Sequence, residues 1–209
     1  EDPVASWKTH NQTLKEKREW LNQKDFKEIH FKGPETDLKV GLADDHEWMG
    51  GASMAQNGVI CNPNIPSEEV FTTPHALRVE GYVSSTKPLS HQGTLIDNIR
   101  VVFEKGSITD AKASKGETVL KKVLESDEGA RRLGEVALVP NSSPISNSGL
   151  LFYNTLFDEN AACHIALGQC YSKCFKGETN LSASEIRERG GNSSTVSYTH
   201  LRAHETCVH

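Results

Sequence analysis

Apolar residues near the amino terminus recur at helical spacing within a strongly polar stretch. Between residues 4 and 23 they stand at Trp7, Leu14 and Leu21 among many Lys, Glu and Arg side chains. Residues three, four or seven positions apart share one face of an α-helix, so a few apolar positions give such a helix one narrow buried face. The pattern predicts a long, largely exposed helix, which we expect to be a linker helix over residues 1–24.

Further along the chain the hydrophobic pattern has a period of two residues, which is typical of half-buried strands. Turn residues separate these runs, with Gly33-Pro34 after the first and Lys105-Gly106 after the fourth. A glycine at such a point favours a tight hairpin. We predict strands at residues 26–31, 38–42, 81–86, 99–104 and 108–113.

The period changes again after residue 113. Val119, Leu120, Val123 and Leu124 are spaced as on one helix face, which predicts a helix over residues 117–125. The same reasoning predicts a second short helix at 128–133, an apolar strand at 136–139 and one or two buried helices within 149–167. Residues 50–64 contain many glycine, asparagine and proline residues, which predicts a segment rich in loops. Together these elements predict an α/β fold in which a mixed sheet is flanked by helices.

Composition and charge narrow the range of partners. The 209 residues carry 23 basic and 28 acidic side chains, a formal charge of −5. No excess of positive charge is left to neutralise phosphates, so we expect no nucleic-acid partner. The apolar runs are far shorter than the roughly 20 residues that cross a bilayer. We therefore expect no membrane partner, and the start at Glu1-Asp2-Pro3 leads us to expect an excerpt of a longer polypeptide.

Five cysteines are an odd number with irregular gaps: Cys61, Cys163, Cys170, Cys174 and Cys207. This spacing is not that of a disulfide framework, and we expect a cytoplasmic protein with reduced thiols. The later cysteines together with His164 form an alternative zinc knuckle, but they lack the two-residue gaps with which paired thiolates reach one ion.

Three acidic or imidazole islands stand beside apolar runs: Glu68-Glu69, Glu135 and His164. Carboxylate and imidazole groups hold a divalent ion and leave it able to polarise a water molecule. Paired surface charges and a hydrogen-bonded core histidine explain the same residues equally simply. The islands are far apart in sequence, so spacing alone leaves both readings open.

Four longer blocks carry a resemblance to a known family. They read NIPSEEVFTTPH at residues 64–75, STKPL at 85–89, RRLGEVALVP at 131–140 and LFDENAACH at 156–164. In this order they closely resemble the thermophilic aminopeptidase T and aminopeptidase S family of dinuclear metallo-aminopeptidases. The resemblance extends from residue 1 to about residue 192 and corresponds to roughly the carboxy-terminal half of that family's chain.

The resemblance implies a metal site and a reaction. Carried over onto the matching blocks, the metal ligands become Glu69, Glu135 and His164, with Glu135 bridging two divalent ions (Zn, Co, Mn or Mg) and counted as catalytic. Tyr171, seven residues after the histidine, corresponds to the family's second catalytic residue and would steady the oxyanion. The implied substrates are peptides that lose their amino-terminal residue, and the implied parent is a homodimer. Two residues are weaker candidates. Glu68 is the less favoured metal ligand of the Glu68-Glu69 pair, and His75 is a candidate for contacting a metal ligand without touching the ion.

The chain departs from the family pattern after residue 192. There the family continues to a His-Val-Asp motif with two more ligands, whereas here the matching positions fall near Ser197 and Thr199. Residues 196–206 resemble a translated sequencing adapter. We therefore expect a partial catalytic domain at 25–195 and an artefactual tail at 196–209 that is disordered or a stray helix. We also expect the fragment to be inactive; the alternative is a non-catalytic, metal-free module that keeps the fold for assembly or peptide binding.

Overall fold

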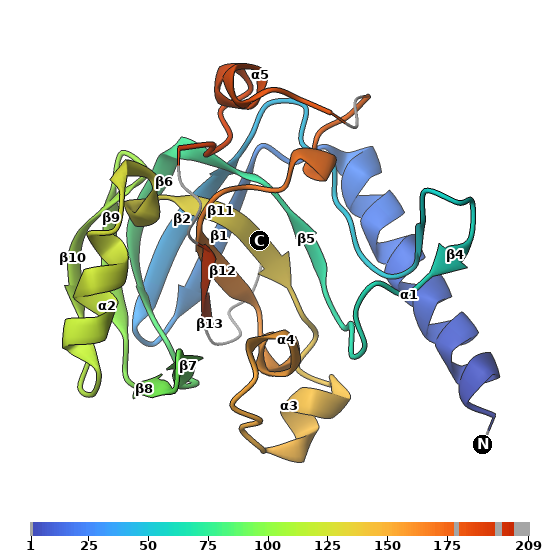
Figure 1. Cartoon of the computed structure of the whole chain (residues 1–209), viewed down its shortest axis with the longest axis horizontal. Helices are drawn as coiled ribbons and strands as arrows, with labels where there is room; N and C mark the ends of the chain where they lie inside the picture. The colour runs from blue at the N-terminus through green and yellow to red at the C-terminus, as the bar shows by residue number, and fades with distance from the viewer. Residues whose placement is uncertain (1, 178–179, 195–197, 203–209) are drawn as a thin grey trace.

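The computed structural model describes residues 2–177, 180–194 and 198–202. Within these ranges, two antiparallel sheets lie between a long helix at one side of the molecule and a shorter helix at the other (Figure 1). No helix in these ranges is both long and apolar enough to cross a membrane. The metal-site candidates belong to the smaller of the two sheets.

The larger sheet has five strands in the order β1-β2-β6-β9-β10. The strands are β1 (Glu28–Gly33), β2 (Thr36–Leu42), β6 (Pro74–Ser84), β9 (Arg100–Glu104) and β10 (Ser107–Lys112). The β9-β10 turn has positive φ at Lys105 (47°) and Gly106 (79°), as the turns that suit hairpin twist require. A Cβ on Gly106 would lie 1.9 Å from the Ala76 carbonyl oxygen, so glycine is needed there for space as well.

The smaller sheet has four strands in the order β13-β12-β11-β5. They are β5 (Val70–Thr72), β11 (Leu133–Leu138), β12 (His164–Gly168) and β13 (Tyr198–Arg202). Two further strand pairs form separate two-stranded sheets: β3 (Ser53–Met54) with β4 (Ile60–Cys61), and β7 (Leu89–His91) with β8 (Thr94–Ile96). All residues of β12 are buried. This sheet therefore has material packed on both faces.

Helix α1 (Pro3–Lys24) has well-defined ends. The Asp2 side chain accepts a hydrogen bond from the Val4 N–H at the start, and Asp25 adopts a left-handed conformation at the end. The helix buries only Leu14 and Leu21. The remaining helices are α2 (Glu117–Leu124), α3 (Pro144–Ser148), α4 (Thr155–Asp158), α5 (Ala183–Glu188) and the 3-10 helices η1 (Glu128–Arg131), η2 (Glu159–Ala161) and η3 (Ser172–Cys174).

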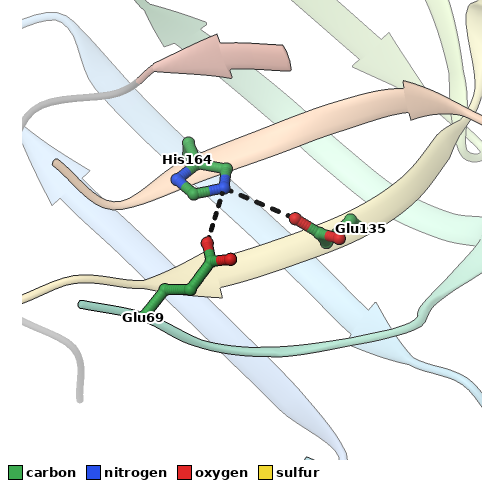
Figure 2. Close-up of side chains that lie close together, drawn as sticks. All are labelled: Glu69, Glu135 and His164. Atoms are coloured by element: carbon green, nitrogen blue, oxygen red, sulfur yellow. Dashed lines mark ion pairs between the residues drawn. The ribbon is translucent and has the colours of Figure 1, made fainter. Parts of the chain in front are cut away.

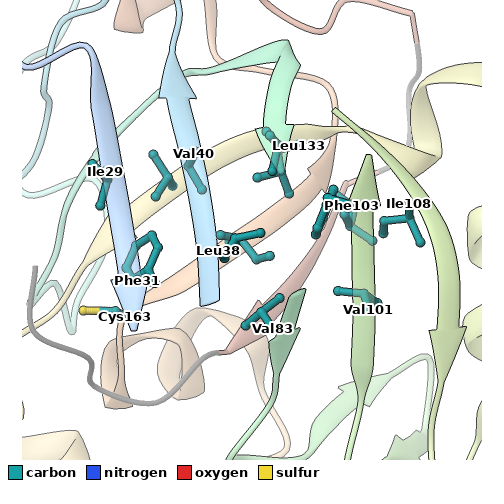
Figure 3. Close-up of a cluster of buried hydrophobic side chains, with 14 of the residues drawn as sticks. Ile29, Phe31, Leu38, Val40, Val83, Val101, Phe103, Ile108, Leu133 and Cys163 are labelled. Carbon is teal, nitrogen blue, oxygen red and sulfur yellow. The ribbon is translucent and has the colours of Figure 1, made fainter. Parts of the chain in front are cut away.

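One hydrophobic core joins the two sheets. Figure 3 shows Phe31, Leu38 and Phe103 of the larger sheet in one cluster with Leu133 and Cys163 from the other side. Alternate residues of β1 are buried, as the period-two pattern predicts. Burying one such side chain contributes roughly 1.5–3 kcal/mol. One face of the smaller sheet thus packs against the core, and the opposite face carries the candidate site.

The structure confirms the amino-terminal helix, the predicted strands and the helix near residues 117–125. It also confirms the predicted fold class, because β-sheets are combined with flanking helices. Three details were wrong. Every strand pairing in the described ranges is antiparallel, so the sheets are not mixed. Short turns join β1 to β2 and β9 to β10 and require antiparallel pairing, whereas the longer connections between the other neighbours in the two main sheets allow either direction.

The second error concerns residues 149–167, where we predicted buried helices. Short helices do occupy 155–161, but His164–Gly168 is strand β12. A strand buried on both faces loses its alternation and looks like a buried helix in sequence. The third error is the expected disorder or stray helix at the end, since residues 198–202 form β13 and pair with β12; the other tail positions, 196–197 and 203–209, lie outside the described residues.

Candidate metal centre

Strand register puts three distant polar residues on one face of the smaller sheet. In the β11-β12 ladder His164 pairs with Ala137, and in the β11-β5 ladder Phe71 pairs with the same alanine. Directly opposed residues share a face, as do residues two apart in a strand. Glu135 and Glu69, each two positions before Ala137 or Phe71, therefore point to the same side.

A β-bulge precedes Glu135. The register of β11 against β12 shifts between Leu133 and Glu135, which leaves Gly134 as the extra residue. Bulges re-aim side chains next to sites. A Cβ on Gly134 would lie 2.4 Å from the Gly168 carbonyl oxygen and 2.5 Å from that of Gln169, so the close backbone approach at this point depends on glycine.

The three side chains converge on one nitrogen. His164 Nε2 lies 3.1 Å from Glu69 Oε2 and 3.4 Å from Glu135 Oε1 (Figure 2). Each residue offers one potential metal-ligand atom, and these three atoms all lie within 4.8 Å of one another. Among the described residues, these are the His, Cys, Asp or Glu side chains that come together in a group of three or more. All three residues are buried, with 8, 3 and 1% of their surface exposed for Glu69, Glu135 and His164.

The protonation of His164 makes this arrangement informative. Nδ1 lies 3.1 Å from the Ala162 carbonyl oxygen, which can only accept, so Nδ1 carries a proton. Nε2 of the neutral ring would then aim a lone pair at two carboxylates. Burial of the ring lowers its pKa, but hydrogen bonds with Glu135 and Glu69 outweigh burial and raise the pKa of His164 well above its usual range. The pocket therefore demands a positive charge between these groups, supplied by a proton or by a cation.

A cavity of about 320 Å³ opens beside the three residues. Its walls include Glu69 and Glu135, a further buried carboxylate at Glu159, and an apolar side with Phe71, Leu156 and Tyr171. Such a volume is at the small end of the range for ligand pockets. The cavity thus combines a strongly acidic wall with an apolar one.

Tyr171 stands at the mouth of this cavity with about half of its surface exposed (51%). Its ring centroid lies 6.0 Å from that of Phe71. Partial burial, followed by the negative charges of Glu135, Glu159 and Glu69, raises the pKa of Tyr171. The phenol therefore keeps its proton at neutral pH and can act as a hydrogen-bond donor.

The weaker candidates lie elsewhere. The Glu68 carboxylate is turned towards α1, where its Oε2 is 3.6 Å from His10 Nε2. His75 on β6 accepts the Leu77 N–H at Nδ1 and packs against Gly190. Neither residue is among those that line the cavity.

The zinc-knuckle alternative finds no support in the geometry. Among the described residues, the ligand atoms that converge with His164 come from Glu69 and Glu135, and no cysteine belongs to this group. Cys163 exchanges hydrogen bonds with the Val139 backbone instead.

Glu159 is the residue of this site that the sequence did not single out. It lies in the Asp-Glu-Asn-Ala block that we used for the resemblance, and its place in that block was the available signal. It follows α4 and begins η2, so the direction of its side chain depends on a turn that no periodicity encodes.

Comparisons with known proteins agree with this picture. Residues 1–202 match the model of the thermophilic metalloprotease family (M29). Aminopeptidase T of Thermus thermophilus is 54% identical over 196 residues, which are 94% of this chain and 48% of that protein. Aminopeptidase 2 of Geobacillus stearothermophilus is 49% identical over 196 residues, again 94% and 48%. The chain spans about half the length of these curated relatives.

Solved structures agree as well. Wild-type AmpT from Thermus thermophilus superposes with a TM-score of 0.92 at 50% identity, covering 97% of this chain and 50% of that one. A 2,5-dihydroxypyridine dioxygenase from Pseudomonas putida KT2440 superposes with a TM-score of 0.53 at 16% identity, covering 77% of this chain and 48% of that one, which shows a shared fold alone.

Proposed function

Since the chain belongs to the family of thermophilic metalloproteases (M29), we propose that it forms the metal-binding part of an aminopeptidase, which removes amino-terminal residues from peptides. The observation that carries the proposal is the convergence of Glu69, Glu135 and His164, with ligand atoms within 4.8 Å of one another. The curated relatives named above are aminopeptidases by name.

The donor set fits a divalent cation. Two carboxylates and one imidazole suit zinc, cobalt or manganese. The fit is supported by His164, whose Nε2 faces two carboxylates while Nδ1 is held by the Ala162 carbonyl, the usual way in which a metal-binding histidine is oriented. A cation held there would polarise the peptide carbonyl and lower the pKa of a water molecule.

We propose Glu159 as a further oxygen ligand for a second ion. It is buried, with 4% of its surface exposed, and it lines the same cavity as Glu69 and Glu135. Three carboxylates at one cavity carry more negative charge than a single divalent ion and a neutral imidazole offset. A second cation would balance the excess, in keeping with the dinuclear centre that the resemblance implies.

Tyr171 and the apolar wall have roles towards the substrate. The phenol keeps its proton, so it can donate a hydrogen bond to the carbonyl oxygen as negative charge develops there. Phe71 and Leu156 offer apolar surface for the first side chain of a peptide. Glu135 would accept a proton from the attacking water as well as hold a cation.

The chain as it stands should hydrolyse peptides poorly. The described residues supply three converging ligands, and the positions that the resemblance gives to the family's remaining histidine and aspartate fall near Ser197 and Thr199. Fewer protein ligands mean weaker binding of at least one ion.

Metal binding and hydrolysis can be tested separately. The purified chain is dialysed against Zn²⁺, Co²⁺ or Mn²⁺, bound metal is counted by mass spectrometry, and hydrolysis of leucine p-nitroanilide is followed with and without chelator. We expect at least one ion per chain, lost in Glu69→Gln, and slow chelator-sensitive hydrolysis. Wild-type protein that retains no ion would contradict the metal site and favour a metal-free binding module.

A further inference from the structure

Asn160 is a buried amide between the segments that carry the site. Only 1% of its surface is exposed. It follows Glu159 in η2 and precedes His164 by four residues, so its backbone belongs to the segment that leads into β12. Its side chain, in contrast, reaches the segment that leads into β5.

Three hydrogen bonds fix this residue. Its Oδ1 accepts the Glu68 N–H at 2.7 Å, a contact between residues 92 positions apart. Its Nδ2 donates to the Leu156 carbonyl oxygen at 2.8 Å, and its own carbonyl accepts from Ser143 Oγ at 2.7 Å. Both ends of the amide therefore have a partner that only this orientation satisfies.

The contact with Glu68 matters because of where that residue lies. Strand β5 begins at Val70, so the Glu68 N–H is outside the sheet ladder and needs another acceptor. Asn160 supplies it one residue before Glu69. The amide thus connects the backbone that presents Glu69 with the backbone that presents His164.

We propose that Asn160 is a positioning residue that holds Glu69 at the distance from His164 that a cation requires. The inference rests on the metal site proposed above and extends it to a residue that touches no ion. Partners placed behind metal ligands typically change metal affinity by about 10–100-fold when they are removed. The acceptor oxygen of Asn160 is the atom on which the effect depends.

Replacing the amide separates acceptor from donor. Asn160→Leu has similar size but no polar atom, so it should weaken Co²⁺ binding about 10–100-fold and change the visible absorption of the bound ion. Asn160→Asp keeps an oxygen for the Glu68 N–H but has no N–H for the Leu156 carbonyl oxygen, so it should recover part of the lost affinity. Ser143→Ala is the matched control, since it removes a buried hydrogen bond to the same residue but leaves the link to Glu68 in place.

The experiment is a Co²⁺ titration of the full chain, followed by visible absorption, with circular dichroism to verify folding. Should the leucine variant fail to fold, Asn160→Ala, which also removes the acceptor oxygen, is expected to show the same loss. Folded Asn160→Leu or Asn160→Ala with wild-type affinity would overturn the proposal. An equal loss of affinity in Ser143→Ala would also overturn it, because it would indicate general loosening of the segment around Asn160 and no specific role for the link to Glu68. Wild-type protein that binds no Co²⁺ would instead refute the metal site itself.

Discussion

The adjacent glutamates Glu68 and Glu69 provide a sharp test of the site. Both are buried to a similar degree, with 9 and 8% exposure, yet Glu68 faces His10 while Glu69 faces His164. Glu69→Gln removes a charged ligand, whereas Glu68→Gln makes the same chemical change one residue away. We expect only the former to abolish stabilisation by metal.

The size of the effect follows from binding linkage. A ligand at 100 times its Kd stabilises the folded state by about 2.7 kcal/mol. For a chain of this length, 1 kcal/mol corresponds to roughly 2–4 °C in Tm, so metal should raise the Tm by about 5–11 °C. With one of three protein ligands neutralised, Glu69→Gln should lose most of this rise, and Glu68→Gln should keep it.

The assay is differential scanning fluorimetry with chelator and with a Zn²⁺ series. Each variant is compared with its own metal-free baseline, so that any change in intrinsic stability cancels. Equal metal-induced shifts in the two variants would refute the reasoning, because they would mean that the ion binds without the Glu69 carboxylate.

Three further outcomes follow from the structure. Tyr171→Phe should lower kcat by about 10²–10³ with little change in KM, measured in any preparation that hydrolyses amino-acid anilides; an unchanged kcat would exclude the phenol as a donor. Gly134→Ala should destabilise the fold by about 1–3 kcal/mol, because the new methyl group would lie 2.4 Å from the Gly168 carbonyl oxygen; wild-type stability in urea unfolding would contradict this. Hydrogen bonds to Lys27 and then Lys176 lower the pKa of Asp25 from 3.8 to about 2, so its contribution is complete above pH 3.8 and disappears as the pH falls towards 2. Asp25→Asn should therefore cost a few tenths of a kcal/mol at pH 6 and clearly less at pH 2, and a loss that is the same at both would argue against the ion pairs.

Local patterns were enough for much of the larger sheet. The alternation in β1 and β2 and the Lys105-Gly106 hairpin are properties of neighbouring residues, and the structure confirms them. Helix α1 was equally legible, because its narrow apolar stripe at Leu14 and Leu21 repeats at helical spacing. In these elements the spacing of the apolar residues predicts both the secondary structure and the face that is buried.

Local patterns were less informative in the smaller sheet, where they predicted only β11, as an apolar strand at residues 136–139. Strand β12 is buried on both faces, so nothing in its sequence alternates and it resembled a helix. The antiparallel pairing of β5, β11 and β12 likewise left no local trace, because partners in such a ladder are distant in sequence.

The sequence by itself determined which side chains were available for chemistry, and its family resemblance selected Glu69, Glu135, His164 and Tyr171 among them. Only the tertiary structure decided that the first three meet within 4.8 Å and that Glu159 joins them at one cavity. The physical reason is register: a shift by one residue in either ladder would turn these side chains towards the core, and register depends on the packing of the whole sheet.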